Sequence, residues 1–269
     1  MPKRKLEEGD TAPPWHYAYE LFKKYKVYSK AALYDDCLAS EFRDLCYRDS
    51  WKNNVETARL IYVKEQLEMQ RPNRWKFVMK CVEGIQPDYI QWQEVKEILR
   101  LNRIEPKVLA QEIYDLLTCK HFKKNCIKLW GIRDSCKSVI GNCIVRPFVT
   151  CYMNNKGSEN EFYMENMLMK TMMLCEELYI TVATAEDFKS ILGGQHLDIS
   201  QKYESKQILG RLPTVVTSNY DRFGRGHLNA IDEAALNCRC FVHQFSTKYE
   251  PKVYISWQQF YLFIQYSLF

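Results

Sequence analysis

The most informative segment of this chain reads Asn125-Cys126-Ile127-Lys128-Leu129-Trp130-Gly131-Ile132-Arg133-Asp134-Ser135-Cys136-Lys137-Ser138. A short apolar run passes through a glycine into a polar loop that ends on Lys-Ser, and a helix is expected from about Val139. This order matches the phosphate-binding pattern G-x-x-x-x-G-K-[ST], except that Cys136 stands where the pattern has its second glycine. In such loops the backbone N–H groups and the helix dipole attract a phosphate. The segment predicts a nucleotide site, although the match is weak when it is taken alone.

The composition is typical of a folded chain with reduced cysteines. Of the 269 residues 46% are hydrophobic and 26% are charged, which is enough apolar material for a core. The formal net charge of +5 is compatible with an anionic partner but does not identify one. The eleven cysteines contain no C-x-x-C pair, so we expect free, mostly buried thiols and neither disulfides nor a zinc site.

The two ends of the chain carry no export or membrane signal. Residues 1–14 form a charged tail in which Pro2-Lys3-Arg4-Lys5 is either a nuclear import signal or a solvated terminus. No apolar region follows that would make the tail a signal peptide. The apolar run from Val253 to Phe269 is short and interrupted by polar residues, so no membrane association is expected.

Between these ends the pattern changes near residue 118. From residue 15 to 118 apolar residues recur at helical spacing, most clearly behind Pro106 at Leu109, Ile113 and Leu116, which predicts a small helical bundle. From 119 to 269 strand-like and helix-like runs alternate, which predicts an α/β domain with a mainly parallel sheet. The expected strands are Ile127–Trp130, Met172–Cys175, Thr214–Ser218 and Cys240–Phe245.

Four polar features follow the loop in a fixed order. The strand at Met172–Cys175 ends in Glu176 and Glu177, and strand-end carboxylates can hold Mg²⁺ and activate water. A glycine pair then leads into a predicted hairpin with Lys202 near its tip, the next strand ends in Asn219, and Arg239 begins the last strand. Each feature is common by chance, so only their order is informative.

Together these features resemble the superfamily 3 helicases, and most closely the parvovirus replication proteins (Rep or non-structural proteins), including the Rep-like accessory proteins of avian adenoviruses. The residues that carry the likeness are Glu97–Asn102, Lys189–Gly194, Gln201-Lys202 and Val215–Asn219. The resemblance extends over almost the whole chain. It implies an AAA+-type helicase domain over 119–269, a parallel sheet flanked by helices, preceded by a small all-α oligomerisation bundle over 15–118.

The resemblance also implies a role for each site residue. The phosphates of ATP would be bound by Gly131, Cys136, Lys137 and Ser138, and Mg²⁺ would be held by Ser138 and Glu176. In hydrolysis Glu177 would activate water, Asn219 would sense the γ-phosphate, and Arg239 would enter the site of a neighbouring subunit. Single-stranded DNA would contact Lys202 and His196 of the hairpin. Such a protein would be a hexamer-like ring of identical subunits acting in the host nucleus.

Departures from the family pattern lead to two alternative functions. No pair of histidines with metal-binding spacing is present, so origin nicking is not expected. Ile132 replaces a usual proline, and Cys136 stands where positive φ is needed, at a cost of about 1–3 kcal/mol. A thiol beside Lys137 at a helix N-terminus is expected to have a lowered pKa and high reactivity, unless it is buried and inert. The chain is therefore either a helicase and ATPase of viral genome replication or a decayed helicase-fold module that binds DNA or proteins. The retained site residues favour the enzyme.

Overall fold

The fold was analysed in a computed structural model that describes residues 12–154, 163–202 and 204–269. The tetrad Pro2-Lys3-Arg4-Lys5 lies outside the described residues. The chain divides into two compact units, Met1–Met69 and Gln70–Phe269, and each is described by itself.

The first unit is helical, as its apolar spacing predicts. It contains α1 (His16–Tyr25), α2 (Lys30–Asp36), α3 (Ala39–Cys46) and nearly all of α4 (Trp51–Gln70). Ala18, Leu21 and Phe22 lie on one side of α1 and are buried against Leu33 and Tyr62. This core contains no residue of the second unit, so the four helices are held together by their own apolar faces.

Three more helices open the second unit: α5 (Arg74–Val82), α6 (Tyr89–Leu101) and α7 (Pro106–Leu117). As expected, α7 begins at Pro106, whose missing N–H removes no helical hydrogen bond at this position. Leu109, Ile113 and Leu116 are fully buried in a core shared with the sheet and with the C-terminal helix. These three helices thus belong to the compact unit Gln70–Phe269. The bundle over 15–118 as a functional domain stays a prediction.

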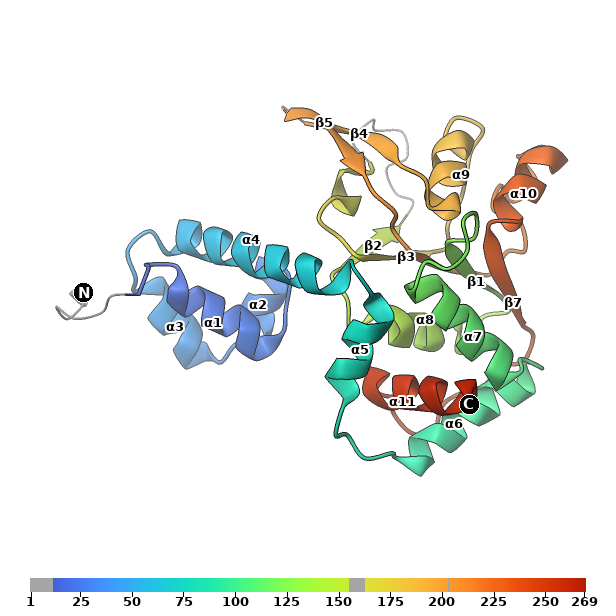
Figure 1. The fold of residues 1–269 in the computed structure, drawn as a ribbon, viewed down its shortest axis with the longest axis horizontal. Coiled ribbons are helices and arrows are strands. Elements are labelled where there is room, and N and C mark those ends of the chain that lie inside the picture. The colour runs from blue at the N-terminus through green and yellow to red at the C-terminus, as the bar shows by residue number, and fades with distance from the viewer. Residues whose placement is uncertain (1–11, 155–162, 203) are drawn as a thin grey trace. The chain divides into compact units, whose positions relative to one another are not determined.

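A five-stranded parallel sheet forms the centre of the second unit (Figure 1). Its strands are β1 (Cys126–Gly131), β2 (Thr150–Asn154), β3 (Met172–Glu176), β6 (Thr214–Ser218) and β7 (Cys240–Phe245), in the spatial order β2-β3-β6-β1-β7. The four expected strands are confirmed to within a residue at each end, and β2 was not predicted. The expected α/β class with a parallel sheet is confirmed.

Helices cover both faces of this sheet. Along β6, Val215 packs into one apolar cluster and Val216 into another, because successive side chains of a strand point to opposite faces. The first face is covered by α5–α7, α8 (Lys137–Val145) and α11 (Trp257–Leu268), and the second by α9 (Ala185–Gly193) and α10 (Ala230–Asn237). Figure 1 shows α9 and α10 apart from the group formed by α7, α8 and α11.

The predicted hairpin is also present. It consists of β4 (Leu197–Gln201) and β5 (Glu204–Leu209), which pair antiparallel as a separate two-stranded sheet. None of the eleven cysteines, which all lie in the described residues, forms a disulfide in the structure, and six of them are buried. Among the described helices, none combines the length and the apolar character needed to cross a membrane.

Candidate nucleotide-binding site

The polar ends of three adjacent strands meet at one edge of the sheet. β6 lies between β1 and β3, and all three run parallel, with Trp130 beside Ser218 and Glu176 beside Thr217. The loop that follows β1, Asn219 after β6, and Glu177 after β3 therefore share this edge. This is the edge at which open α/β sheets bind ligands.

Gly131 allows the chain to turn out of β1. Its φ is 147°, and a Cβ built there would lie 1.9 Å from the carbonyl oxygen of Phe245 at the end of β7. The next residue, Ile132, donates its N–H to the same oxygen at 2.9 Å. Only glycine fits this close approach of the two strand ends, so the first glycine of the loop is required by packing.

Lys137, the first residue of α8, points back into the loop. Its ammonium donates to the Gly131 carbonyl at 3.1 Å, to the Ser135 hydroxyl at 3.2 Å and to the side-chain oxygen of Asn219 at 3.3 Å. It also donates to the carbonyl of Ile132. Burial lowers the pKa of Lys137, although the neighbouring carboxylate of Glu177 opposes the shift. The ammonium is thus held inside the loop by neutral oxygens.

The loop around Lys137 has the features of an anion cradle. Among the described residues, no protein oxygen accepts a hydrogen bond from the backbone N–H groups of Ser135 to Ser138. These groups lie at the N-terminus of α8, where the helix dipole favours negative charge. They border an open cavity of about 670 Å³ between loop residues 134–139 and the segment 248–251. The residues present fit a bound phosphate.

Cys136 corrects one expectation. Its backbone is left-handed, with φ 67° and ψ 14°, as the pattern required at this position. The residue is 8% exposed, and its thiol donates to the carbonyl of Tyr249 at 3.0 Å. Burial, reinforced by Glu94, raises the pKa of the Cys136 thiol to about 11 despite the nearby Lys137. The expected lowering of this pKa is wrong, because burial outweighs both the lysine and the helix end. The thiol is buried, as the alternative required, and its low reactivity stays a prediction.

The two acidic residues after β3 differ in their surroundings. Glu176 ends the strand and is exposed, as is Ser138. Glu177 has φ 53°, and its carboxylate accepts the backbone N–H of Asn219 at 3.1 Å. Lys137, Asn219 and Glu177 thus form a continuous row of polar contacts.

A metal ion at this edge would need phosphate oxygens of a bound nucleotide among its ligands. The described residues contain no cluster of three or more His, Cys, Asp or Glu side chains suited to a metal ion. Magnesium commonly takes one or two protein oxygens together with phosphate oxygens and water. Ser138 and Glu176 could supply the one or two protein oxygens of such a site, but they are too few to bind Mg²⁺ without the phosphates.

Comparison with known proteins shows the family of the chain. Residues 52–224 match the family described as "Parvovirus non-structural protein NS1". The chain belongs to the parvovirus NS1 family. Protein Rep52 of Adeno-associated virus 2 is 31% identical over 144 residues, which are 49% of this chain and 36% of Rep52. Initiator protein NS1 of Human parvovirus B19 is 26% identical over 132 residues, which are 49% of this chain and 20% of that protein. The matched part therefore spans about a third or less of these relatives.

Solved structures agree with this NS1-family assignment at the level of the fold. The X-ray structure of JCV helicase has a TM-score of 0.60 with 13% identity, covering 93% of this chain and 85% of that chain. A structure of JCV helicase with a bound small molecule has a TM-score of 0.58 with 15% identity, covering 90% and 78%. The expected fold class, a parallel sheet flanked by helices and preceded by further helices, is confirmed. At such identity the likeness concerns the fold alone.

Two residues of this NS1-family site were missed by the sequence analysis. Tyr249 forms one wall of the cavity and donates its N–H to the carbonyl of Asp134 at 2.8 Å. Arg225 donates to the backbone carbonyl of Glu177 at 2.9 Å. Tyr249 lies in the loop after β7 and Arg225 in the loop after β6, and neither belongs to a motif. The only signal was the flanking pair Gly224 and Gly226, which indicates a tight turn at Arg225.

The remaining predicted residues lie outside this cluster. Arg239 precedes β7 at the opposite edge of the sheet, where its carbonyl accepts the N–H of Asn125 and its guanidinium donates to the carbonyl of Ala235. Lys202 is exposed in the turn after β4, and His196 is exposed just before that strand. The structure brings Gly131, Cys136, Lys137, Ser138, Glu176, Glu177 and Asn219 to one edge and leaves the other three residues apart from it.

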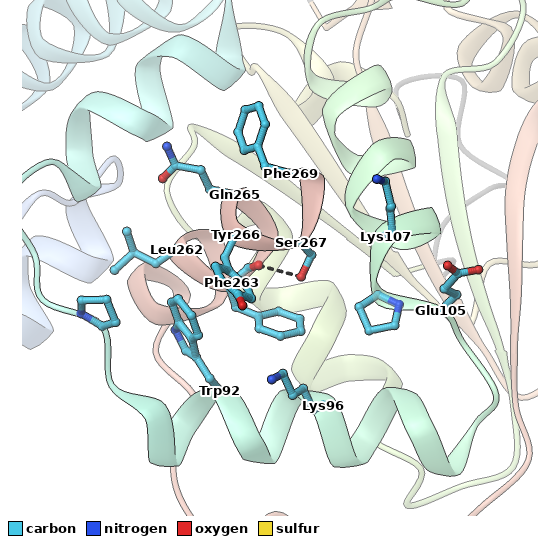
Figure 2. A pocket seen from close by; sticks show the side chains of 12 residues that line it. Trp92, Lys96, Glu105, Lys107, Leu262, Phe263, Gln265, Tyr266, Ser267 and Phe269 are labelled. Atoms are coloured by element: carbon cyan, nitrogen blue, oxygen red, sulfur yellow. Dashed lines mark hydrogen bonds between the residues drawn. The ribbon is translucent and has the colours of Figure 1, made fainter.

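A second cavity of about 860 Å³ contains none of the predicted residues. It lies among α6, α7 and α11 and is lined largely by apolar side chains, including Trp92, Phe263 and Tyr266. Figure 2 shows Trp92 and Lys96 extending from α6 and Lys107 from α7. It contains neither the loop after β1 nor the carboxylate pair after β3, so we place the nucleotide site at the smaller cavity.

Proposed function

We propose that this chain is the ATP-dependent DNA helicase part of a viral replication protein. The observation that carries the proposal is the row formed by Lys137, Asn219 and Glu177 beside the free N–H groups of the loop. A cation, a polar sensor and a carboxylate at adjacent strand ends are the groups that nucleotide hydrolysis requires. Membership in the NS1 family and the fold of a viral helicase support this reading.

In the proposed reaction, the N–H groups of Ser135 to Ser138 bind the phosphates of ATP. Lys137 exchanges its contacts with the loop carbonyls for phosphate oxygens, a charge-assisted interaction that is stronger than the neutral ones it replaces. Ser138 and Glu176 would hold Mg²⁺, which would supply positive charge beside the phosphates. Glu177 accepts a proton from the attacking water, and the side-chain oxygen of Asn219 orients that water.

Assembly and DNA binding are further parts of the proposal. Arg239 lies at the opposite edge of the sheet from Lys137, so in the proposed role it would act on the site of a neighbouring subunit. We propose that the subunits form a hexamer-like ring held together partly by the helical region 15–118. Lys202 and His196 on the exposed hairpin would contact phosphates of single-stranded DNA, which gives affinity without base readout. We propose the host nucleus as the location of the protein. We also propose, from the likeness to the Rep-like proteins of avian adenoviruses, that the chain comes from a virus of that kind.

The alternative function is a module that has lost turnover and binds DNA or protein partners. The observation that favours it is Cys136, because its side chain occupies a loop position where the family pattern has none. The thiol also ties the loop to Tyr249, which could restrict the adjustment that ATP binding requires.

Steady-state ATP hydrolysis, with and without single-stranded DNA, separates the two functions. The native chain, Lys137→Ala and Cys136→Gly are compared, with thermal unfolding to show that each is folded. We expect native hydrolysis that DNA stimulates and that Lys137→Ala abolishes. If the native chain and Lys137→Ala are equally inactive while Cys136→Gly hydrolyses ATP, the native protein is the non-hydrolysing module.

A further inference from the structure

Arg225 faces Glu177 across the nucleotide edge of the sheet, and both residues have unusual backbone conformations. The φ angles are 49° for Arg225 and 53° for Glu177, in the left-handed region that non-glycine residues rarely adopt. Such conformations cost about 1–3 kcal/mol each and persist where the surroundings fix them, often at functional sites. Two left-handed residues that face each other at one site suggest a functional role and not only a turn of the chain.

The backbone of the loop that carries Arg225 is held by hydrogen bonds to two other segments. The buried carboxylate of Glu233 on α10 accepts the N–H groups of Phe223 at 3.1 Å and Gly224 at 2.6 Å. The carbonyl of Phe223 accepts the N–H of Ile180 at 3.0 Å. The backbone next to Arg225 is therefore attached both to α10 and to the segment that follows Glu177.

The side chain of Arg225 is fixed as well. Its guanidinium lies over the ring of Tyr220 at 4.3 Å and over the ring of Tyr179 at 5.2 Å. Its Nη2 donates to the Glu177 carbonyl at 2.9 Å and lies 3.9 Å from the Glu177 carboxylate oxygen Oε2. The other carboxylate oxygen of Glu177 is the one that accepts the Asn219 N–H. One carboxylate is thus placed from two sides, by Asn219 and by Arg225.

We propose that Arg225 is a positioning residue that holds the Glu177 carboxylate in the orientation needed for hydrolysis. The inference rests on the proposed ATPase function and adds a residue to it. Without Arg225, Glu177 keeps the single hydrogen bond from Asn219 and its carboxylate can rotate about that contact. A planar guanidinium stacked on two tyrosines is pre-organised, and a lysine at this position can supply the charge but not the stacking.

The test separates orientation of Glu177 from binding of the nucleotide. Arg225→Gln and Arg225→Lys are compared with the native chain for kcat and KM of ATP hydrolysis and for affinity toward a fluorescent ATP analogue with Mg²⁺. Arg222→Gln is the matched control, because Arg222 is an exposed arginine of the same loop whose side chain has no hydrogen-bond or ion-pair partner among the described residues. We expect Arg225→Gln to lower kcat by about tenfold or more, with KM and analogue affinity changed less than about twofold. Arg225→Lys should recover part of the loss, and Arg222→Gln should behave as the native chain does.

Each other outcome has a definite meaning. If Arg225→Gln keeps the native kcat, or loses kcat and thermal stability together without recovery in Arg225→Lys, the proposal is overturned and Arg225 is only structural. A native chain that binds the analogue but does not hydrolyse ATP overturns the proposed ATPase function itself, and this inference with it. The native measurement therefore tells the two failures apart.

Discussion

Cys136 illustrates, at the scale of single residues, how packing can reverse an expectation based on chemistry alone. A helix N-terminus and a neighbouring lysine both favour a thiolate. Tyr249 nevertheless covers the thiol and accepts its hydrogen bond, and the neutral form is favoured. Cys136 keeps the left-handed backbone that the second glycine of the pattern would adopt. Its hydrogen bond to Tyr249 is a contact that a glycine could not make.

The raised pKa of Cys136 predicts slow alkylation. With a pKa of about 11, the thiolate fraction at pH 8 is on the order of one in a thousand, and it rises as the pH approaches 11. The exposed Cys81 and Cys238 should react with iodoacetamide well before Cys136 in the folded chain. Peptide mass spectrometry over time at pH 8 and pH 10 measures the three rates. Labelling of Cys136 at pH 8 as fast as that of Cys81 would contradict the buried thiol.

At the scale of elements, the position of the loop depends on how the ends of β1 and β7 meet. The sequence pattern predicted both strands but not that they are neighbours. In the structure Gly131 lies against Phe245, so the direction in which the chain leaves β1 is set by β7. β2 was missed although its sequence, Thr-Cys-Tyr-Met-Asn, follows Phe148-Val149 in a run of apolar and β-branched residues that is typical of a strand.

Gly131→Ala tests this close approach. A Cβ 1.9 Å from the Phe245 carbonyl oxygen forces the strand ends apart, so we expect a loss of about 3 kcal/mol in the free energy of unfolding. Gly210→Ala is the matched control, because no atom lies within 4 Å of the added Cβ. Chemical denaturation of both variants gives the difference. Equal stability of the two variants would show that the β1–β7 contact tolerates a side chain.

At the scale of the whole molecule, two apolar cores share no residue. One contains Phe22 and lies in Met1–Met69, while Phe260 belongs to a core of Gln70–Phe269. Compact units with separate cores can unfold separately, so a single unfolding free energy need not describe such a chain. The helices α5–α7, which the sequence grouped with the first four, belong to the second unit because their apolar faces pack on the sheet and on α11.

Separate cores predict two unfolding transitions. Phe22→Ala should lower the midpoint of one transition and Phe260→Ala that of the other, because each removes a fully buried ring at a cost of about 3–5 kcal/mol. Differential scanning calorimetry of the native chain and both variants checks this. Each variant serves as the control for the other. A single transition that both substitutions shift equally would mean that the two units unfold as one.

The sequence by itself determined the order of the motifs, four of the five parallel strands and the family likeness, because these follow from local spacing and residue type. It also placed Glu177 and Asn219 at strand ends and Lys137 in the loop that follows a strand, and parallel pairing then brought these segments together. Only the tertiary structure decided the state of the Cys136 thiol, the place of Arg225 beside Glu177 and the boundary of the compact units. The physical reason is that burial and contact depend on segments far apart in the chain: Tyr249 covers Cys136, and a loop after β6 reaches back to the residue after β3.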